Sequence, residues 1–233
     1  MIVILLYLQS KMKNLQIHIE VNKELYLKNP DSSDLGRKII STSIDLIHEL
    51  GFETFTFKKL GIKIASPESS IYRYFDNKHT LLIYLVSWYW SWIEYQLVFS
   101  TMNIESSTER LKNAISILVD PSKVSQPNYY INIDLLSEII ITESVKAYHT
   151  NHVDDDNKKG FFKTYKQVVQ RVSDMVLQCN ANYEFPHMLV STVIEGAHQQ
   201  RYFAKHLPKL TDIKKGTDSI SEFYTKMVVQ VIK

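Results

Sequence analysis

The chain has 233 residues, of which 45% are hydrophobic and 22% charged, with a formal net charge of +2. That is ample for a sizeable core, and only six glycines and six prolines favour helices over a β-rich fold. The single cysteine, Cys179, excludes an internal disulfide framework and a zinc site of several cysteines. Nothing requires an oxidising compartment, so we expect a cytoplasmic protein.

Residues 1–33 are expected to form an N-terminal extension. The apolar run at 2–8 is too short to span a bilayer and follows no basic residue, so neither a membrane segment nor a signal peptide is expected. We hypothesise that Met12 is the natural start. Alternating apolar residues over 15–30 resemble a strand, which leaves a short hairpin or an extended arm as alternatives. With no arginine cluster, this arm is expected to pack on the first helix rather than enter a DNA groove.

Residues 34–80 are predicted to hold three short helices and the start of a fourth. Apolar residues at helical spacing make 34–50 amphipathic, with Asp34 as candidate N-cap and Gly51 just beyond the end. Thr56 opens a second helix of about two turns, which the sequence Ala-Ser-Pro at 65–67 breaks. Pro67 suits the first turn of a third helix. Ile71 and Phe75 face inward there, leaving these residues outward: Ser69, Ser70, Tyr72 and Arg73.

This segment resembles the DNA-binding domain of TetR-type transcriptional regulators. The matching residues are Gly51-Phe52, Thr56, the run Ile-Tyr-Arg-Tyr-Phe at 71–75 and Lys78 at the start of the long fourth helix. In a helix-turn-helix, the second helix of the pair enters the major groove. The resemblance implies a DNA-binding surface made of Thr56, Lys58, Pro67, Glu68, Ser69, Ser70, Tyr72, Arg73 and Lys78, with Tyr72 and Lys78 on phosphates.

Three positions in the turn depart from the family pattern. Ala65 replaces the usual glycine, Ser66 an aliphatic residue, and Glu68 a basic or small polar residue. A carboxylate at the head of the recognition helix repels phosphate but can accept a hydrogen bond from cytosine. Residues 55–80 hold five basic and two acidic residues, a charge of +3, so one module alone is expected to bind DNA weakly.

Residues 81–233 are predicted to form a helical ligand-binding and dimerisation domain. The fourth helix, 78–101, is unusually aromatic and apolar around most of its circumference, so we expect it to be buried on several sides. Asn103–Thr108 and Asp120–Pro127 are expected to be breaks, and 151–157 a charged link. The remaining predicted helices are 107–119, 129–150, 160–180, 185–206 and 217–232.

A small-molecule effector site is expected between helices of this domain. The lining candidates are Trp88, Trp92, Tyr95, Tyr130, His149, Tyr165 and His198. Each residue by itself is more often plain core than a ligand contact. Together they would suit an apolar or aromatic effector whose identity the sequence does not give.

Helices 185–206 and 217–232 are the expected homodimer interface. Ser191, Gly196, Ala197 and Ala204 allow close approach on the first. The second has an apolar face made of Ile220, Phe223, Tyr224, Met227, Val228 and Val231. Two helices from each subunit would make a four-helix bundle, as the resemblance implies, although these residues could instead close the monomer core.

No catalytic constellation stands out, and no cofactor or metal is expected. His149, His152 and Asp154 to Asp156 could be drawn as a metal site, but an acidic run between helices is ordinarily solvated. HExxH, a glycine-rich phosphate loop, Gly-x-Ser-x-Gly and paired cysteines are all missing.

The sequence therefore predicts an all-α protein and not an enzyme. The resemblance implies a ligand-responsive homodimeric repressor that binds palindromic operator DNA. The alternative is a dimeric helical protein that binds a small molecule or a partner and has weak or lost DNA binding.

Overall fold

The structure is a computed structural model that describes residues 19–120, 130–213 and 216–233. The proposed start at Met12, the alternation at Ile17 and most of the predicted break at Asp120–Pro127 lie outside these ranges. Within them the regular elements are helices, with no strand. None of these helices combines the length and the continuous apolarity that a bilayer-spanning segment needs.

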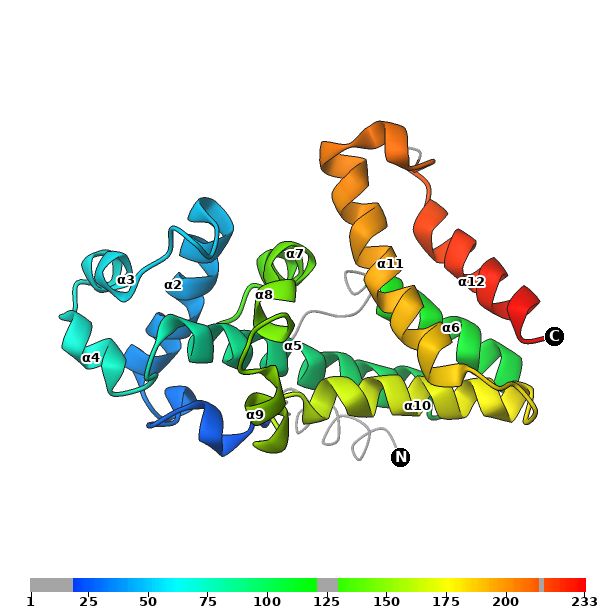
Figure 1. The fold of residues 1–233 in the computed structure, drawn as a ribbon, viewed down its shortest axis with the longest axis horizontal. Helices are drawn as coiled ribbons and strands as arrows, with labels where there is room; N and C mark the ends of the chain where they lie inside the picture. The colour runs from blue at the N-terminus through cyan, green and yellow to red at the C-terminus, as the bar shows by residue number, and fades with distance from the viewer. Residues whose placement is uncertain (1–18, 121–129, 214–215) are drawn as a thin grey trace, which may run out of the picture.

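Three short helices form one end of the molecule: α2 (Asp34–Leu50), α3 (Phe57–Ile64) and α4 (Glu68–Tyr72) (Figure 1). Their apolar residues at helical spacing, including Ile39, Leu60 and Ile71, are buried against one another as predicted. The predicted cap of α2 is wrong by one residue. The Ser33 hydroxyl, not Asp34, accepts the Gly36 N–H at 3.2 Å, and Asp34 instead pairs with Arg37 in the first turn.

Helix α5 (Lys78–Thr101) has the predicted bounds, and Asn77 caps it by accepting the Thr80 N–H at 2.9 Å. From Leu81 to Trp90 every residue is buried, so α5 is enclosed all round its circumference. It runs from the three-helix end far into the rest of the molecule and contributes to the core of both parts (Figure 1).

The larger part packs its helices on α5. Helices α6 (Ser107–Val119) and α10 (Lys163–Cys179) lie against it, and α11 (Pro186–His206) and α12 (Ser219–Val231) cover these in turn. Helix α7 (Ile133–Glu143) lies between α2 and α11, followed by the short helices α8 (Val145–Tyr148) and α9 (Val153–Lys158) (Figure 1).

Two predictions for this region are wrong. The single helix over 129–150 is interrupted at Ser144, and Val145, which follows the break, lies on the surface with 48% exposure. The expected link over 151–157 folds into α9, whose Asp156 is buried and 3.5 Å from His79. Aspartates in a first turn stabilise a helix N-terminus, so the acidic run supports a helix rather than a solvated link.

Residues 19–33, here called the N-terminal strap, also differ from the strand-like pattern. Two 3₁₀ turns, η1 (Lys23–Leu25) and η2 (Pro30–Ser32), replace a hairpin. The Leu27 N–H donates to the Tyr74 carbonyl at 2.8 Å, and the Asn22 side chain donates to the Lys159 carbonyl at 2.9 Å. The strap therefore packs as expected of an arm, and it joins the end of α4 to the turn between α9 and α10.

Lys78 holds the connection between α2 and α3. Its ammonium donates to the carbonyls of Phe52, Glu53 and Phe55 at 3.1, 3.1 and 3.3 Å. The sequence analysis expects this ammonium on a DNA phosphate. The structure corrects that assignment, because all three N–H groups are directed at backbone carbonyls within the protein.

His198 is buried in the core on α11, and its Nδ1 has no hydrogen-bond partner among the described residues. Burial lowers the pKa of His198 to about 4, and the nearby charge of Arg201 acts in the same direction. The sequence analysis considers a plain core residue more common than a ligand contact at each of these positions, and the burial of His198 agrees with that interpretation.

His198 should make the free energy of unfolding depend on pH in the acidic range. Its unfolded pKa is about 6.5, so the unfolded chain takes up this proton first, and stability is lost as the pH falls from about 6.5 towards 4. The loss should approach about 3 kcal/mol at pH 4. We expect His198→Phe to flatten urea-unfolding stability over this window relative to the wild type. His206→Gln, exposed at the end of the same helix, is the control; equal slopes in all three proteins would contradict the assignment.

Lys78→Met should destabilise the protein by about 2 kcal/mol, because three carbonyls lose a charged donor. Lys58→Met, on the exposed face of α3, should change stability by less than about 0.5 kcal/mol. Urea unfolding compares them. Equal stabilities for the two variants would show that the three hydrogen bonds donated by Lys78 do not contribute to the free energy of unfolding.

Candidate nucleic-acid interface and effector groove

Helices α3 and α4 form a helix-turn-helix. Thr56 caps α3 by accepting the Lys59 N–H at 3.2 Å, and Ala65 ends it in the left-handed conformation at φ 54°. A Cβ on Gly61 would lie 2.7 Å from the Ser66 carbonyl oxygen, so the glycine that permits the tight turn sits inside α3. Ala65, which departs from the family pattern, adopts the conformation that glycine favours.

The predicted DNA-binding residues share one surface. Thr56, Lys58, Pro67, Ser69, Tyr72 and Arg73 are exposed, while Glu68 and Ser70 are half-buried. The Tyr72 ring packs edge-on against Phe57 with centroids 5.1 Å apart, which leaves its side chain 47% exposed. Ile71 and Phe75 face inward as predicted. Helix α4 ends at Tyr72, and Arg73 follows as its C-cap.

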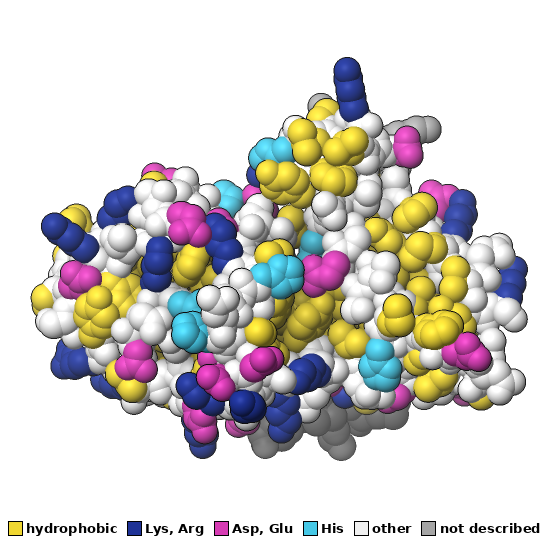
Figure 2. Space-filling model, viewed as in Figure 1, with side chains coloured by type: hydrophobic (Ala, Val, Ile, Leu, Met, Phe, Trp, Pro, Cys, Tyr) yellow, Lys and Arg dark blue, Asp and Glu magenta, His cyan; other side chains and the backbone are white. Residues whose placement is uncertain are grey.

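Basic side chains lie around the end of the molecule that carries α3 and α4 (Figure 2). Not all of them are available. Lys59 donates to the Thr54 carbonyl at 2.9 Å and Lys38 to the Ile64 carbonyl at 3.1 Å. Lys58 and Lys63 are exposed and form no ion pair within the described ranges, so with Arg73 they are the cations best placed to meet an external anion.

The seven predicted effector residues do not form one pocket. Trp88 and Trp92 are fully buried on α5, whereas His149 is exposed at the end of α8. Tyr95 stacks on Phe99 with centroids 6.1 Å apart, and the Tyr130 hydroxyl donates to Asp31. These residues therefore belong to separate parts of the molecule.

Tyr165 and His198 both lie against Trp90, in a cluster that also contains Tyr148 and Glu195. The Trp90 indole N–H donates to the Tyr148 hydroxyl at 2.9 Å, and the Trp90 and Tyr165 rings stack at 4.3 Å. The Tyr165 hydroxyl donates to Glu195 at 2.8 Å. Burial raises the pKa of Tyr148 and of Tyr165. Sequence reasoning missed Trp90 and Tyr148, although the aromatic run in α5 signalled the first.

A groove of about 550 Å³ lies elsewhere, between α5, α6 and α10. Arg171 donates from Nε to Glu94 at 2.8 Å, and Arg110 donates to Gln178 at 2.9 Å. Apolar side chains from α5 and α10 complete its wall: Val98, Met102 and Met175. None of the seven predicted effector residues lines this groove within the described part of the chain.

The two helices expected at the dimer interface form, but some of their apolar residues are buried within the chain and others are exposed. Ile220, Tyr224 and Val228 on α12 are buried in the chain itself. A Cβ on Gly196 would lie 2.4 Å from the Tyr224 hydroxyl oxygen, so this small residue lets α12 approach α11. Exposed apolar side chains remain on both helices: Phe185, Met188, Tyr202, Phe223 and Val231.

No protein-family model and no curated protein matches the chain. Among solved structures, the transcriptional regulator FadR from Bacillus subtilis in complex with stearoyl-CoA is 15% identical, with a TM-score of 0.55 over 84% of this chain and 98% of that one. AibR in complex with isovaleryl coenzyme A and operator DNA is 15% identical, with a TM-score of 0.53 over 82% and 97%.

The superantigen pfit is similar at the same level, with 14% identity and a TM-score of 0.53 over 88% of this chain and 92% of that one. At such identities these likenesses establish the fold alone. The chain therefore has an all-helical fold that transcriptional regulators use.

Proposed function

We propose that the protein is a ligand-responsive, homodimeric transcriptional regulator of the TetR type that binds palindromic operator DNA as a repressor. The observation that carries the proposal is the helix-turn-helix, whose second helix turns Ser69, Tyr72 and Arg73 outward at one end of the molecule. The operator DNA in the AibR complex supports it, because that chain has a similar fold.

A dimer follows from the geometry of DNA. One module offers few cations, whereas two modules about 34 Å apart would reach successive major grooves of one palindrome. The exposed apolar side chains on α11 and α12 support this arrangement, since a second copy could cover them on binding. Phe223, for example, is 58% exposed.

The groove between α5, α6 and α10 is our proposed effector site. It places two guanidinium groups, Arg110 and Arg171, beside thioether and aliphatic side chains, and an anionic ligand would have to displace Glu94 from Arg171. That combination suits a ligand with an anionic head and an apolar chain, as in the acyl coenzyme A ligands of the FadR and AibR structures. This ligand class replaces the purely apolar or aromatic effector expected from the aromatic residues.

The proposed regulation is two-state. Because α5 forms one wall of the groove and also the core of the helix-turn-helix part, a ligand that favours another position of α5 would change the spacing of the two recognition helices. The ligand must bind the two states with different affinity for this to weaken operator binding.

Selection of bound sequences from a random duplex pool at about 0.15 M salt tests the function. We expect an enriched palindrome whose affinity falls steeply with salt. Arg73→Ala should weaken binding to all sequences and reduce the salt slope by about 1, and Tyr72→Ala should also weaken binding uniformly, whereas Ser69→Ala or Ser70→Ala should change the preferred sequence.

Lys163→Met, at the exposed first residue of α10, is the control and should change neither affinity nor preference. A folded, dimeric protein that enriches no sequence would refute the proposal. It would favour the alternative, a helical ligand- or partner-binding protein, which the half-buried Glu68 at the head of α4 supports; Glu68→Lys would then be the first reversion to test.

Isovaleryl and stearoyl coenzyme A are the first effector probes. We expect at least one of them to raise the melting temperature and to weaken binding to the selected operator. Arg171→Met should reduce this response about tenfold, the effect of one lost charged contact, while leaving operator affinity without ligand unchanged. Lys163→Met should respond like the wild type. An unaltered response in Arg171→Met would place the effector elsewhere.

A further inference from the structure

Helix α7 stands between the helix-turn-helix part and the outer helix α11. A cleft of about 400 Å³ opens where the three helices meet. Helix α2 contributes Ile47 and His48 to it, α7 contributes Glu138 and Glu143, and α11 contributes Tyr202 and Lys205. The interactions across this cleft are polar and connect helices that are far apart in the sequence.

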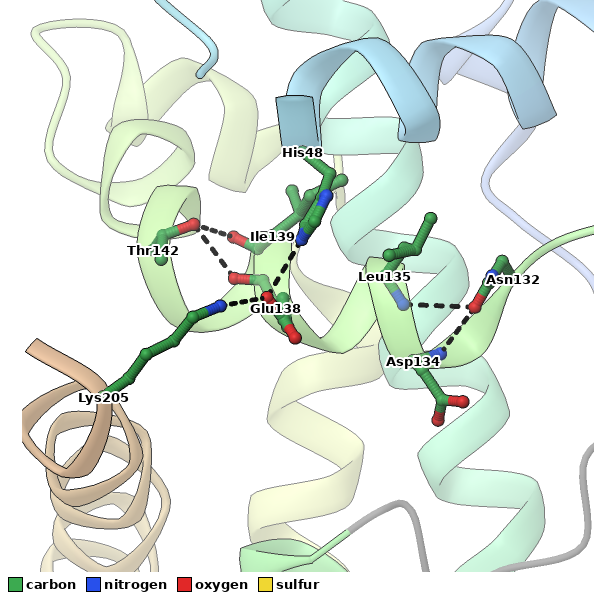
Figure 3. Close-up of polar contacts among 8 residues, drawn as sticks. All are labelled: His48, Asn132, Asp134, Leu135, Glu138, Ile139, Thr142 and Lys205. Carbon is green, nitrogen blue, oxygen red and sulfur yellow. Dashed lines mark hydrogen bonds and ion pairs between the residues drawn. The ribbon is translucent and has the colours of Figure 1, made fainter. Parts of the chain in front are cut away.

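Glu138 joins α2 to α11 through one oxygen. Its Oε2 accepts a hydrogen bond from His48 Nε2 at 2.9 Å and another from Lys205 Nζ at 2.8 Å (Figure 3). The hydrogen bonds from Lys205 and then His48 hold the pKa of Glu138 below its usual range, so the carboxylate stays ionised. Its side chain is 47% exposed, so water can replace either partner.

Glu143, on the next turns of α7, makes a different kind of contact. It accepts the Phe52 N–H at 3.1 Å and pairs with Lys146 at 2.7 Å, with only 11% of its side chain exposed. A buried carboxylate on a backbone N–H is costly to break. Helix α7 therefore contacts the C-terminal end of α2 at two points. The contact at Glu143 is buried and costly to break, whereas the contact at Glu138 is exposed and can exchange with water.

We propose that Glu138 is a positioning residue that makes the orientation of α2, and so of the helix-turn-helix, depend on the position of α11. When α11 carries Lys205 away, the carboxylate keeps only His48, and α2 can turn about its fixed end at Glu143. Because α11 also carries part of the proposed dimer surface, docking of the second copy would set the angle of the recognition helix. The inference rests on the proposed regulator function and adds a link separate from α5.

A mutant cycle on the full-length protein tests this link. Lys205→Met and His48→Gln each remove one partner, and Glu138→Gln removes the shared charge with little change in shape. Each single variant should lower affinity for the selected operator about two- to fivefold, the size expected of half-exposed ion pairs. The effects of Lys205→Met and His48→Gln should be non-additive with Glu138 present and additive in Glu138→Gln.

Lys209→Met, just beyond α11 and exposed, is the matched control and should bind like the wild type. Amide hydrogen exchange gives a readout that needs no DNA. Lys205→Met should speed exchange in α2, although it lies on α11, and should have no such effect in the Glu138→Gln background. A change of this kind is not expected if Lys205 only supports α11.

The outcomes separate the two proposals. Additive affinities and unchanged exchange in α2 would overturn the link even if the protein binds its operator as proposed. If the wild type binds no operator, the proposed function fails, and exchange alone then decides: faster exchange in α2 supports the link, and unchanged exchange overturns it.

Discussion

The burial of α5 around its whole circumference is the constraint on which the rest of the structure depends. A helix that carries Trp88, Tyr89, Trp90 and Trp92 in one stretch must be covered on every side. Tyr26 of the strap and Phe75, just after α4, pack on Tyr84 near its first turns, and α6, α7, α8 and α10 cover the remainder. Residues of both parts join one hydrophobic core along this helix, so neither part can change its position on α5 without disturbing the packing of the other.

Backbone groups, more than side-chain pairs, fix the helix-turn-helix to this core. Lys78 donates to three carbonyls between α2 and α3, Glu143 accepts the Phe52 N–H, and Leu27 of the strap donates to the Tyr74 carbonyl. These groups lie in connections, where no helical ladder satisfies them. Each contact therefore stabilises the turn and attaches it to another element at once. The exposed His48–Glu138–Lys205 bridge instead joins side chains of α2, α7 and α11 through one shared atom.

The larger part contains two regions of different chemical character, an aromatic cluster and a polar groove. Stacked rings around Trp90 and Tyr165 fill the space between α5, α8, α10 and α11, and the polar atoms of Trp90, Tyr148 and Tyr165 find partners within the cluster. Such a cluster is close-packed and leaves little room for a ligand. The groove beside Arg171 has the opposite character, with charged and amide groups at the surface above a few apolar side chains. A regulator with an amphipathic effector would use the second kind of site.

The helices whose signals lie within a few neighbouring residues could be predicted from the amino-acid sequence. The bounds of α2 and α5, the start of α3 after Thr56 and the inward positions of Ile71 and Phe75 follow from periodicity and capping within about four residues. The helix-turn-helix, and with it most of the candidate DNA surface, was predictable for the same reason. Even locally, the break at Ser144 was missed, because its neighbours suit a continuous helix and Ser144 itself keeps helical backbone angles.

Contacts between residues that are distant in the sequence became known only from the folded chain. Lys78 lies 26 residues from Phe52, Glu138 lies 90 from His48, and Trp90 lies 58 from Tyr148. No periodic pattern encodes such pairs, because they depend on how helices cross and on which polar groups remain unpaired once the cores are full. Lys78, expected on a DNA phosphate, instead donates to backbone carbonyls of its own chain. The residues expected to form one aromatic pocket lie in separate places, and a polar groove lies where the sequence analysis predicts no site.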